Sequence, residues 1–302
     1  MTCFINIRSN SYLCRIINRP IHFKDIPNMN IQLKLFIIWF FAILFTLVSA
    51  VYQKMTGPTY PVRGKAEIGG QKVKFQLIRS YDLSDDAKVT VVVPDTSIKG
   101  EIRLRRFKSM DNWQTQPLLR HGDTLIGALP HLPPAGKVMY DITLVKGSQR
   151  VLLNDHPAVL RYTGYVPRYI LIPHILLMFL AMLFSTLTGL MVLFHGRNSY
   201  LYAWITVVAV AAGGLVLGPI VQKFAFDAYW TGWPFGHDVT DNKSIFAFIF
   251  WVIALVMMKK HHENRFWPVL AAIVLLAVFL IPHSVWGSEI DFTRGPKTEV
   301  TK

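Results

Sequence analysis

Hydrophobic and polar positions divide the chain into two kinds of segment. Five stretches contain no Asp, Glu, Lys or Arg, and they cover residues 35–51, 169–194, 199–222, 244–258 and 266–286. A helix needs about 20 apolar residues to cross the roughly 30 Å hydrocarbon core of a bilayer. Only a helix satisfies its backbone hydrogen bonds within one such segment. The pattern therefore predicts five transmembrane helices, one near the N-terminus and four in the C-terminal half.

Between the first two apolar stretches the pattern changes to a period of two. Residues 72–77 alternate polar and apolar side chains, and residues 89–93 are rich in β-branched ones. Such runs are typical of half-buried strands. Turn-forming pairs such as Gly69-Gly70 and Pro94-Asp95 separate them. We expect six to eight short strands over residues 60–155, folded as an all-β sandwich.

The first apolar stretch has two interpretations. It ends in Val48-Ser49-Ala50, small residues of the kind that a signal peptidase reads, and Met29 is a possible start. A short basic region, an apolar core and such a site make a signal peptide. Residues 35–51 are therefore either a transmembrane anchor or a cleaved signal peptide. Both interpretations export the segment that follows.

Basic residues indicate the orientation of the spans. Lys and Arg gather in the arm 1–34 and in the loops 195–199 and 259–265, which all fall on one side if every span crosses once. Cytoplasmic loops carry this excess of positive charge. Arg161 and Arg168, near the outer start of the second span, run against the trend. The opposite side receives the β-rich domain and the 223–243 loop.

These observations predict a membrane protein of a bacterial-type cytoplasmic (inner) membrane, with its large domain on the outer side. The expected parts are a basic cytoplasmic arm, an anchor or signal peptide, an exported all-β sandwich, a four-helix transmembrane bundle and an outer tail. Their ranges are 1–34, 35–51, 60–155, 169–286 and 287–302.

The net charge limits the classes of partner, and the cysteine content limits how the exported domain is stabilised. The formal net charge is +14, but the basic residues flank apolar spans or are scattered through the β-rich region. We therefore expect the lipid bilayer and another envelope or membrane protein as partners, and no nucleic acid. The two cysteines, Cys3 and Cys14, precede the first span. The exported domain thus has no disulfide framework and must rely on its own apolar core.

Residues 124–130 and 133–142 resemble the late strands of immunoglobulin-like and fibronectin-III-like domains. In those domains a strand ends in a proline-rich bend and a tyrosine-bearing strand follows. The resemblance extends over about 90 residues and lacks the paired cysteines of antibody domains. It implies a sandwich with a general interaction role, and it implies no reaction.

Candidate chemistry lies on the predicted outer face. Ile-Pro-His opens the second span at His174 and closes the fifth at His283, and the 227–241 loop contributes His237 and Asp238. The first and last helices of a four-helix unit are neighbours, so we predict that His174 and His283 approach each other. They would hold a haem, or with His237 and Asp238 a transition metal. The alternative is that they are interfacial residues within an aromatic belt.

Two functions follow from this sequence. The leading hypothesis is a scaffold or accessory subunit that presents a β-sandwich outside the membrane. The alternative is a redox or metal-handling protein that uses the outer histidines. The chain has no P-loop, HExxH or Gly-x-Ser-x-Gly motif to favour an enzyme. A transporter is disfavoured because the spans contain no carboxylate or arginine that would mark a substrate path.

Overall fold

The structure is a computed structural model that describes residues 30–82, 84–196, 198–236, 238–281 and 289–294. The chain divides into two compact units. The first is helical and comprises residues 1–51, 174–216 and 243–281. The second holds all described strands and comprises residues 52–173, 217–242 and 282–302.

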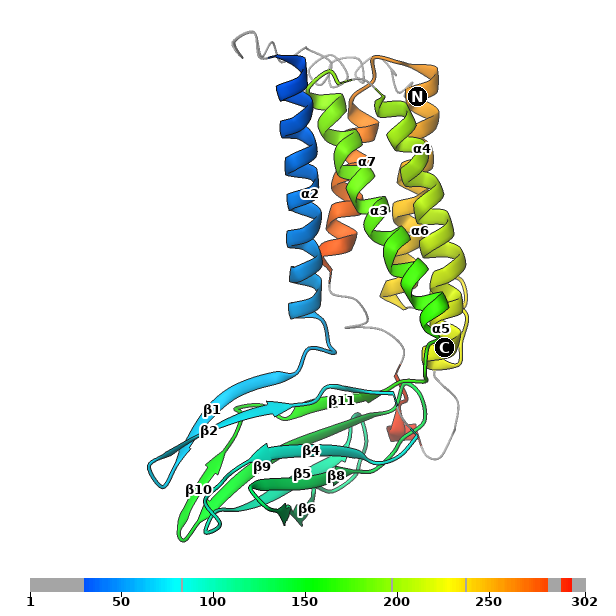
Figure 1. Ribbon diagram of the computed structural model, residues 1–302. Helices are drawn as coiled ribbons and strands as arrows, with labels where there is room; N and C mark the ends of the chain where they lie inside the picture. The colour runs from blue at the N-terminus through cyan, green and yellow to red at the C-terminus, as the bar shows by residue number, and fades with distance from the viewer. Residues whose placement is uncertain (1–29, 83, 197, 237, 282–288, 295–302) are drawn as a thin grey trace, which may run out of the picture. The chain divides into compact units, whose positions relative to one another are not determined.

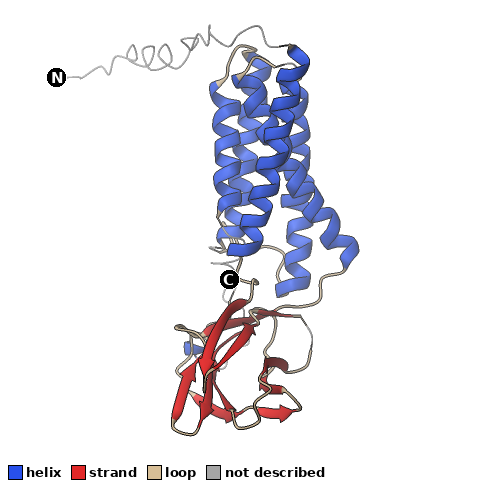
Figure 2. Cartoon of the chain, turned by 60° about the vertical axis from the view of Figure 1, so that its left-hand side comes forward, coloured by secondary structure: helices blue, strands red, loops and turns tan. Residues whose placement is uncertain are grey.

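Helices lie in each of the five uncharged stretches, one near the N-terminus and four in the C-terminal half of the chain. In Figure 2 the helices of the first unit run side by side along their lengths. The helices of the chain, most of them labelled in Figure 1, are α2 Ile31–Thr56, α3 Arg168–Leu193, α4 Ser199–Val210, the π-helical η1 Ala211–Leu217, α5 Gly218–Phe226, α6 Val239–Lys260 and α7 Phe266–Leu280. Of these, α5 lies wholly in the second unit. A short 3-10 helix, η2, covers Phe292–Arg294 in the second unit.

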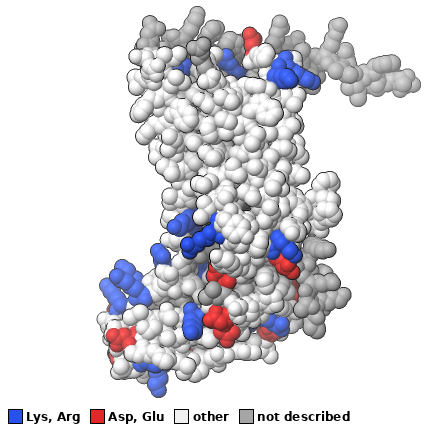
Figure 3. All heavy atoms as spheres, turned by 45° about the vertical axis from the view of Figure 1, so that its right-hand side comes forward, with Lys and Arg blue, Asp and Glu red and all other residues white. Residues whose placement is uncertain are grey.

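Four of the described helical segments are long and apolar enough to cross a membrane. They are Ile31–Thr56, Arg168–Leu193, Ser199–Phe226 and Val239–Lys260. α7 is apolar but shorter, at 15 residues, and residues 282–288 of the predicted fifth span lie outside the described part of the chain. Figure 3 shows an uncharged band over the helices of the first unit, with charged side chains gathered at its end. The distribution is that of a multi-pass membrane protein.

Small side chains let the helices of the first unit pack closely. Trp251 is fully buried in a core that also contains alanines of several helices, such as Ala181, Ala203 and Ala271. A Cβ on Gly189 would lie only 3.0 Å from the Cβ of Ala272. Packing of this kind drives helix association in lipid, where burial of apolar surface contributes little.

The strands form three sheets. β1 pairs with β2; β3, β11, β9, β5 and β6 lie in that order, with β10 also on β9; and β4, β8 and β7 make the third sheet. All pairs are antiparallel except β11 with β3. The strands are β1 Val62–Ile68, β2 Gln71–Leu77, β3 Ser80–Tyr81, β4 Ala87–Val92, β5 Lys99–Arg106, β6 Gln114–Pro117, β7 Leu119–His121, β8 Thr124–Leu129, β9 Lys137–Lys146, β10 Gln149–Leu152 and β11 Ala158–Tyr162.

The alternating sequence pattern sets which face of each strand is buried. In β2, Val73, Phe75 and Leu77 are buried, and the polar residues between them are exposed or half-buried. Buried side chains from all three sheets form one core. Gly69 and Gly70 close the β1–β2 hairpin with positive φ angles of 57° and 77°, which glycine adopts without steric cost.

The last strand extends the sheet beyond the range expected from sequence. β11 pairs with β9 on one side and β3 on the other, and its Leu160 and Tyr162 belong to the core. The strand-rich domain therefore continues past residue 155 and ends only six residues before α3 begins at Arg168. The described part of the 287–302 tail belongs to this second unit.

Candidate functional site

Asp241 organises the loop that joins α5 to α6. Its Oδ2 accepts hydrogen bonds from the backbone N–H groups of Thr231 at 2.7 Å and Gly232 at 3.0 Å, and from the side chain of Gln222 at 3.2 Å. A Cβ on Gly232 would lie 2.6 Å from the Cβ of Asp241, so only glycine allows this approach. The buried carboxylate thus fixes the loop against the first turn of α6.

Asp238 caps the N-terminus of α6. Its Oδ1 accepts from the backbone N–H of Thr240 at 2.7 Å, and its Oδ2 accepts from the Thr231 hydroxyl at 3.2 Å. A carboxylate at this position satisfies a backbone donor of the first turn and interacts well with the helix dipole. Asp238, predicted as a metal ligand, is therefore buried and already engaged in fixing the loop.

His174 lies in α3 and is bound to a distorted part of the next span. Its Nδ1 is 2.8 Å from the carbonyl oxygen of Gly213, inside the π-helical segment η1. Since a carbonyl only accepts, Nδ1 carries the proton, and in the neutral ring Nε2 then keeps its lone pair. A Cβ on Gly213 would lie 2.9 Å from the Cβ of Leu177, so the two helices approach closely here.

The predicted ligand set is only partly visible. His237 and His283 lie outside the described residues, so the predicted approach of His174 to His283 stays a prediction. His174 belongs to the first unit and Asp238 to the second. Within the described ranges, no group of three or more His, Cys, Asp or Glu side chains is placed to hold a metal ion.

A buried basic pair lies where β9 meets β11. Lys137 and Arg161 are register partners on these strands, and they are only 8% and 6% exposed. The Lys137 ammonium donates to Oε2 of Glu289 at 2.6 Å, and Lys108 binds the other carboxylate oxygen. Sequence reasoning did not find this pair, although Arg161 stood out as a positive charge on the predicted outer side.

Burial acts on the titration of all three groups. Burial lowers the pKa of Lys137, the charge of Arg161 lowers it further, and Glu289 partly offsets both. Burial also lowers the pKa of Arg161, against the attraction of Glu289 and Asp238. For Glu289, burial alone would raise the pKa, but hydrogen bonds from Lys108 and Lys137 outweigh it and bring the pKa below its usual value. The desolvation of two cations thus dominates this cluster.

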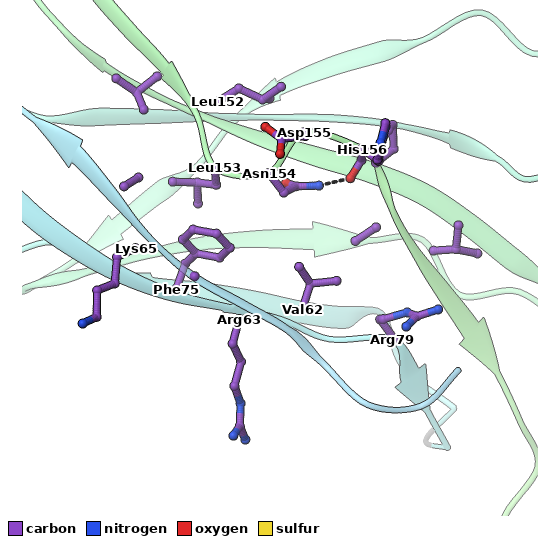
Figure 4. A pocket seen from close by; sticks show the side chains of 16 residues that line it. Val62, Arg63, Lys65, Phe75, Arg79, Leu152, Leu153, Asn154, Asp155 and His156 are labelled. Atoms are coloured by element: carbon purple, nitrogen blue, oxygen red, sulfur yellow. Dashed lines mark hydrogen bonds between the residues drawn. The ribbon is translucent and has the colours of Figure 1, made fainter. Parts of the chain in front are cut away.

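A cleft of about 710 Å³ lies between β1 and the chain that connects β10 to β11. Figure 4 shows Val62 and Phe75 on one side of it, Leu152 to His156 on the other, and the charged ends of Arg63 and Lys65 pointing away. The side-chain N–H of Asn154 donates to the carbonyl oxygen of His156. Its Oδ1 is buried and accepts no hydrogen bond from any residue that the structure describes. A buried amide oxygen left in this way is costly unless a ligand or water binds it.

Comparison with models of known protein families, with curated proteins and with solved structures finds no match to this chain.

Proposed function

We propose that the protein is a membrane-anchored scaffold or accessory subunit whose strand-rich domain lies outside a bacterial-type cytoplasmic membrane and binds a partner protein. The domain would be a β-sandwich of the immunoglobulin or fibronectin-III kind, consistent with a single core shared by three sheets. The four apolar helices supply the anchoring. Because a fold alone does not determine function, a binding role for this domain depends on a specific site.

The cleft beside β1 is the observation that carries this proposal. Its volume is within the range of ligand-binding sites, and its lining combines apolar side chains with one unsatisfied acceptor. An apolar side chain of a partner would fill the space next to Val62 and Phe75. A small movement of the connection from β10 to β11 would expose Oδ1 of Asn154 to a backbone N–H of the same segment, which gives the contact a direction.

Site-specific photo-crosslinking in the native membrane tests this function. A photoreactive residue at Leu152, which lines the cleft, is expected to give one discrete protein adduct. The matched control is Val92 on β4, which is also about half exposed, at 58% against 46% for Leu152. The Asn154→Leu change should weaken the adduct from position 152. Equal adducts from both positions, or none from 152, would argue against partner binding in the cleft.

The hydrogen bond of His174 favours a second candidate, a haem or transition-metal protein. Metal-ligating histidines commonly donate their other ring N–H to a carboxylate or backbone carbonyl, which orients the ring. The bond from Nδ1 to Gly213 has this form and leaves Nε2 for a ligand. Purified protein should then show haem absorption or a stoichiometric metal content that the His174→Leu change abolishes. If the purified wild-type protein is colourless and contains no metal, the haem or metal function is rejected and the scaffold function remains.

A further inference from the structure

The buried pair of Arg161 and Lys137 is arranged as an incomplete ion cluster. Like charges directly opposite each other on neighbouring strands are destabilising, and buried charges are ordinarily paired. Lys137 is paired, because Glu289 accepts its hydrogen bond. Arg161 is only 6% exposed, and its guanidinium makes no hydrogen bond or ion pair with any described residue. Its nitrogens are not among the fully enclosed atoms without a partner, so the exposed part of Arg161 includes them. One cation of the two therefore lacks a hydrogen-bonding partner.

The groups around Arg161 do not supply that partner. The ring of Phe226 lies 5.3 Å from the guanidinium carbon, a contact that leaves the five N–H donors unused. Glu289 and Asp238 act on Arg161 only through charge. Glu289 is held by Lys108 and Lys137, and Asp238 by Thr231 and Thr240.

The position of Arg161 in the chain indicates the source of an anion. Five residues separate β11 from α3, and within that link the N–H of Gly164 donates to the carbonyl oxygen of Ala225 in α5 at 2.9 Å. The same unit exposes large aromatic side chains around the ends of these helices, between 60% and 76% each: Tyr165, Tyr169, Tyr229, Trp233 and Phe235. Tyr and Trp are enriched at the level of lipid headgroups.

We propose that Arg161 binds a phosphate group, with Lys137 as the adjoining cation, and that a lipid headgroup supplies it. The planar guanidinium matches two phosphate oxygens in a forked hydrogen bond, and an ammonium contributes as a point charge. Lys108, Lys137 and Arg161 all interact electrostatically with the Glu289 carboxylate, and Asp238 adds its charge at Arg161. The nearby Asp241 is balanced by donors from Gln222, Thr231 and Gly232. This site uses none of the residues of the cleft, so it stands or falls independently of partner binding.

Thermal unfolding of the full-length protein in lipid nanodiscs tests the proposal. Wild-type protein is expected to unfold at a higher temperature in phosphatidylglycerol than in a phosphate-free glycolipid. The Arg161→Met variant should lose this difference and still unfold cooperatively, because it removes the cost of burying a charge that has no ion-pair partner among the described residues. The control Arg63→Met alters an exposed arginine bonded to Gln76 and should keep the difference.

The same measurement on protein in detergent, with inorganic phosphate added, distinguishes the two sources of phosphate. If inorganic phosphate alone raises the unfolding temperature and the nanodisc lipids do not differ, the site binds free phosphate. Should Arg161→Met fail to fold, Arg161→Lys keeps the charge without the fork and should bind the effective phosphate about tenfold more weakly. The proposal is overturned if wild type responds to neither source, or if both Arg161 variants respond as wild type does.

Discussion

Arg103 and Asp141 lie opposite each other on β5 and β9 and form an ion pair, with Nη2 of the arginine 2.8 Å from Oδ2 of the carboxylate. Asp141 is buried, whereas the arginine side chain is 47% exposed. The ring of Trp113 lies 4.5 Å from the guanidinium carbon and a similar 4.6 Å from that of Arg105. Because Arg103 is partly exposed, this ion pair is weaker than a fully buried one. The buried carboxylate of Asp141 nevertheless needs the arginine to balance its charge.

Removing Arg103 should therefore destabilise the strand-rich domain. We expect Arg103→Met to lower the free energy of unfolding by about 1–3 kcal/mol, because a buried carboxylate is left unpaired. The double variant Arg103→Met, Asp141→Leu should recover most of the loss. Thermal unfolding followed by tryptophan fluorescence measures both, with the exposed Arg63→Met as control. A double variant with a lower free energy of unfolding than the Arg103→Met variant would contradict this account.

Tyr162 should make stability fall at alkaline pH. Its hydroxyl donates to the carbonyl oxygen of Leu129 at 3.0 Å, and burial raises its pKa from 10.0 to about 12. A group with a raised pKa stabilises the fold fully below its unfolded pKa, and that contribution is lost as pH rises through the folded value. Stability should thus decline between about pH 10 and 12. The test is to follow tyrosine ionisation by ultraviolet absorbance and to measure the free energy of unfolding over the same pH range. The Tyr162→Phe change should reduce the decline in stability.

The strand β11 should decide whether the domain folds alone. A fragment of residues 58–164 is expected to be soluble and β-rich by circular dichroism, since it contains every described strand. A fragment of residues 58–155 lacks Leu160 and Tyr162, which are at most 1% exposed in the core, and also lacks β11, the described strand that joins β3 to β9. We expect it to aggregate or to unfold at a lower temperature. Equal stability of the two fragments would show that β11 contributes little.

The side of the membrane can be read by chemical labelling. Placed in a variant without Cys3 and Cys14, a cysteine at Ser288 should react with an impermeant reagent added from outside, and one at Ser199 should not. The expectation follows from the basic arm 1–34 and the basic loops 195–199 and 259–265. Lysed cells, in which both positions react, provide the control. The reverse pattern would place the strand-rich domain in the cytoplasm.

Ligand chemistry was harder to predict than architecture, as the histidines show. Pattern and depth singled out His174, but the carbonyl it binds belongs to a π-helical segment that no sequence period announces. Asp238 stays a predicted metal ligand, and the structure shows that its carboxylate caps α6. The hydrogen bonds of His174 and Asp238 depend on which atoms lie within about 3 Å of each side chain. A hydropathy pattern carries no information about such distances.

The sequence by itself determined the division of this protein into apolar helices and strands. Uncharged runs such as residues 169–194 leave a chain no alternative but a helix in lipid, and the alternation in residues 72–77 buries one face of a strand. Only the tertiary structure decided that β11 lies between β3 and β9, which sets Arg161 opposite Lys137, and that β1 stands apart from the β10–β11 connection to leave a cleft. Local patterns act over a few residues, whereas strand order and register are settled by the packing of segments far apart in the chain.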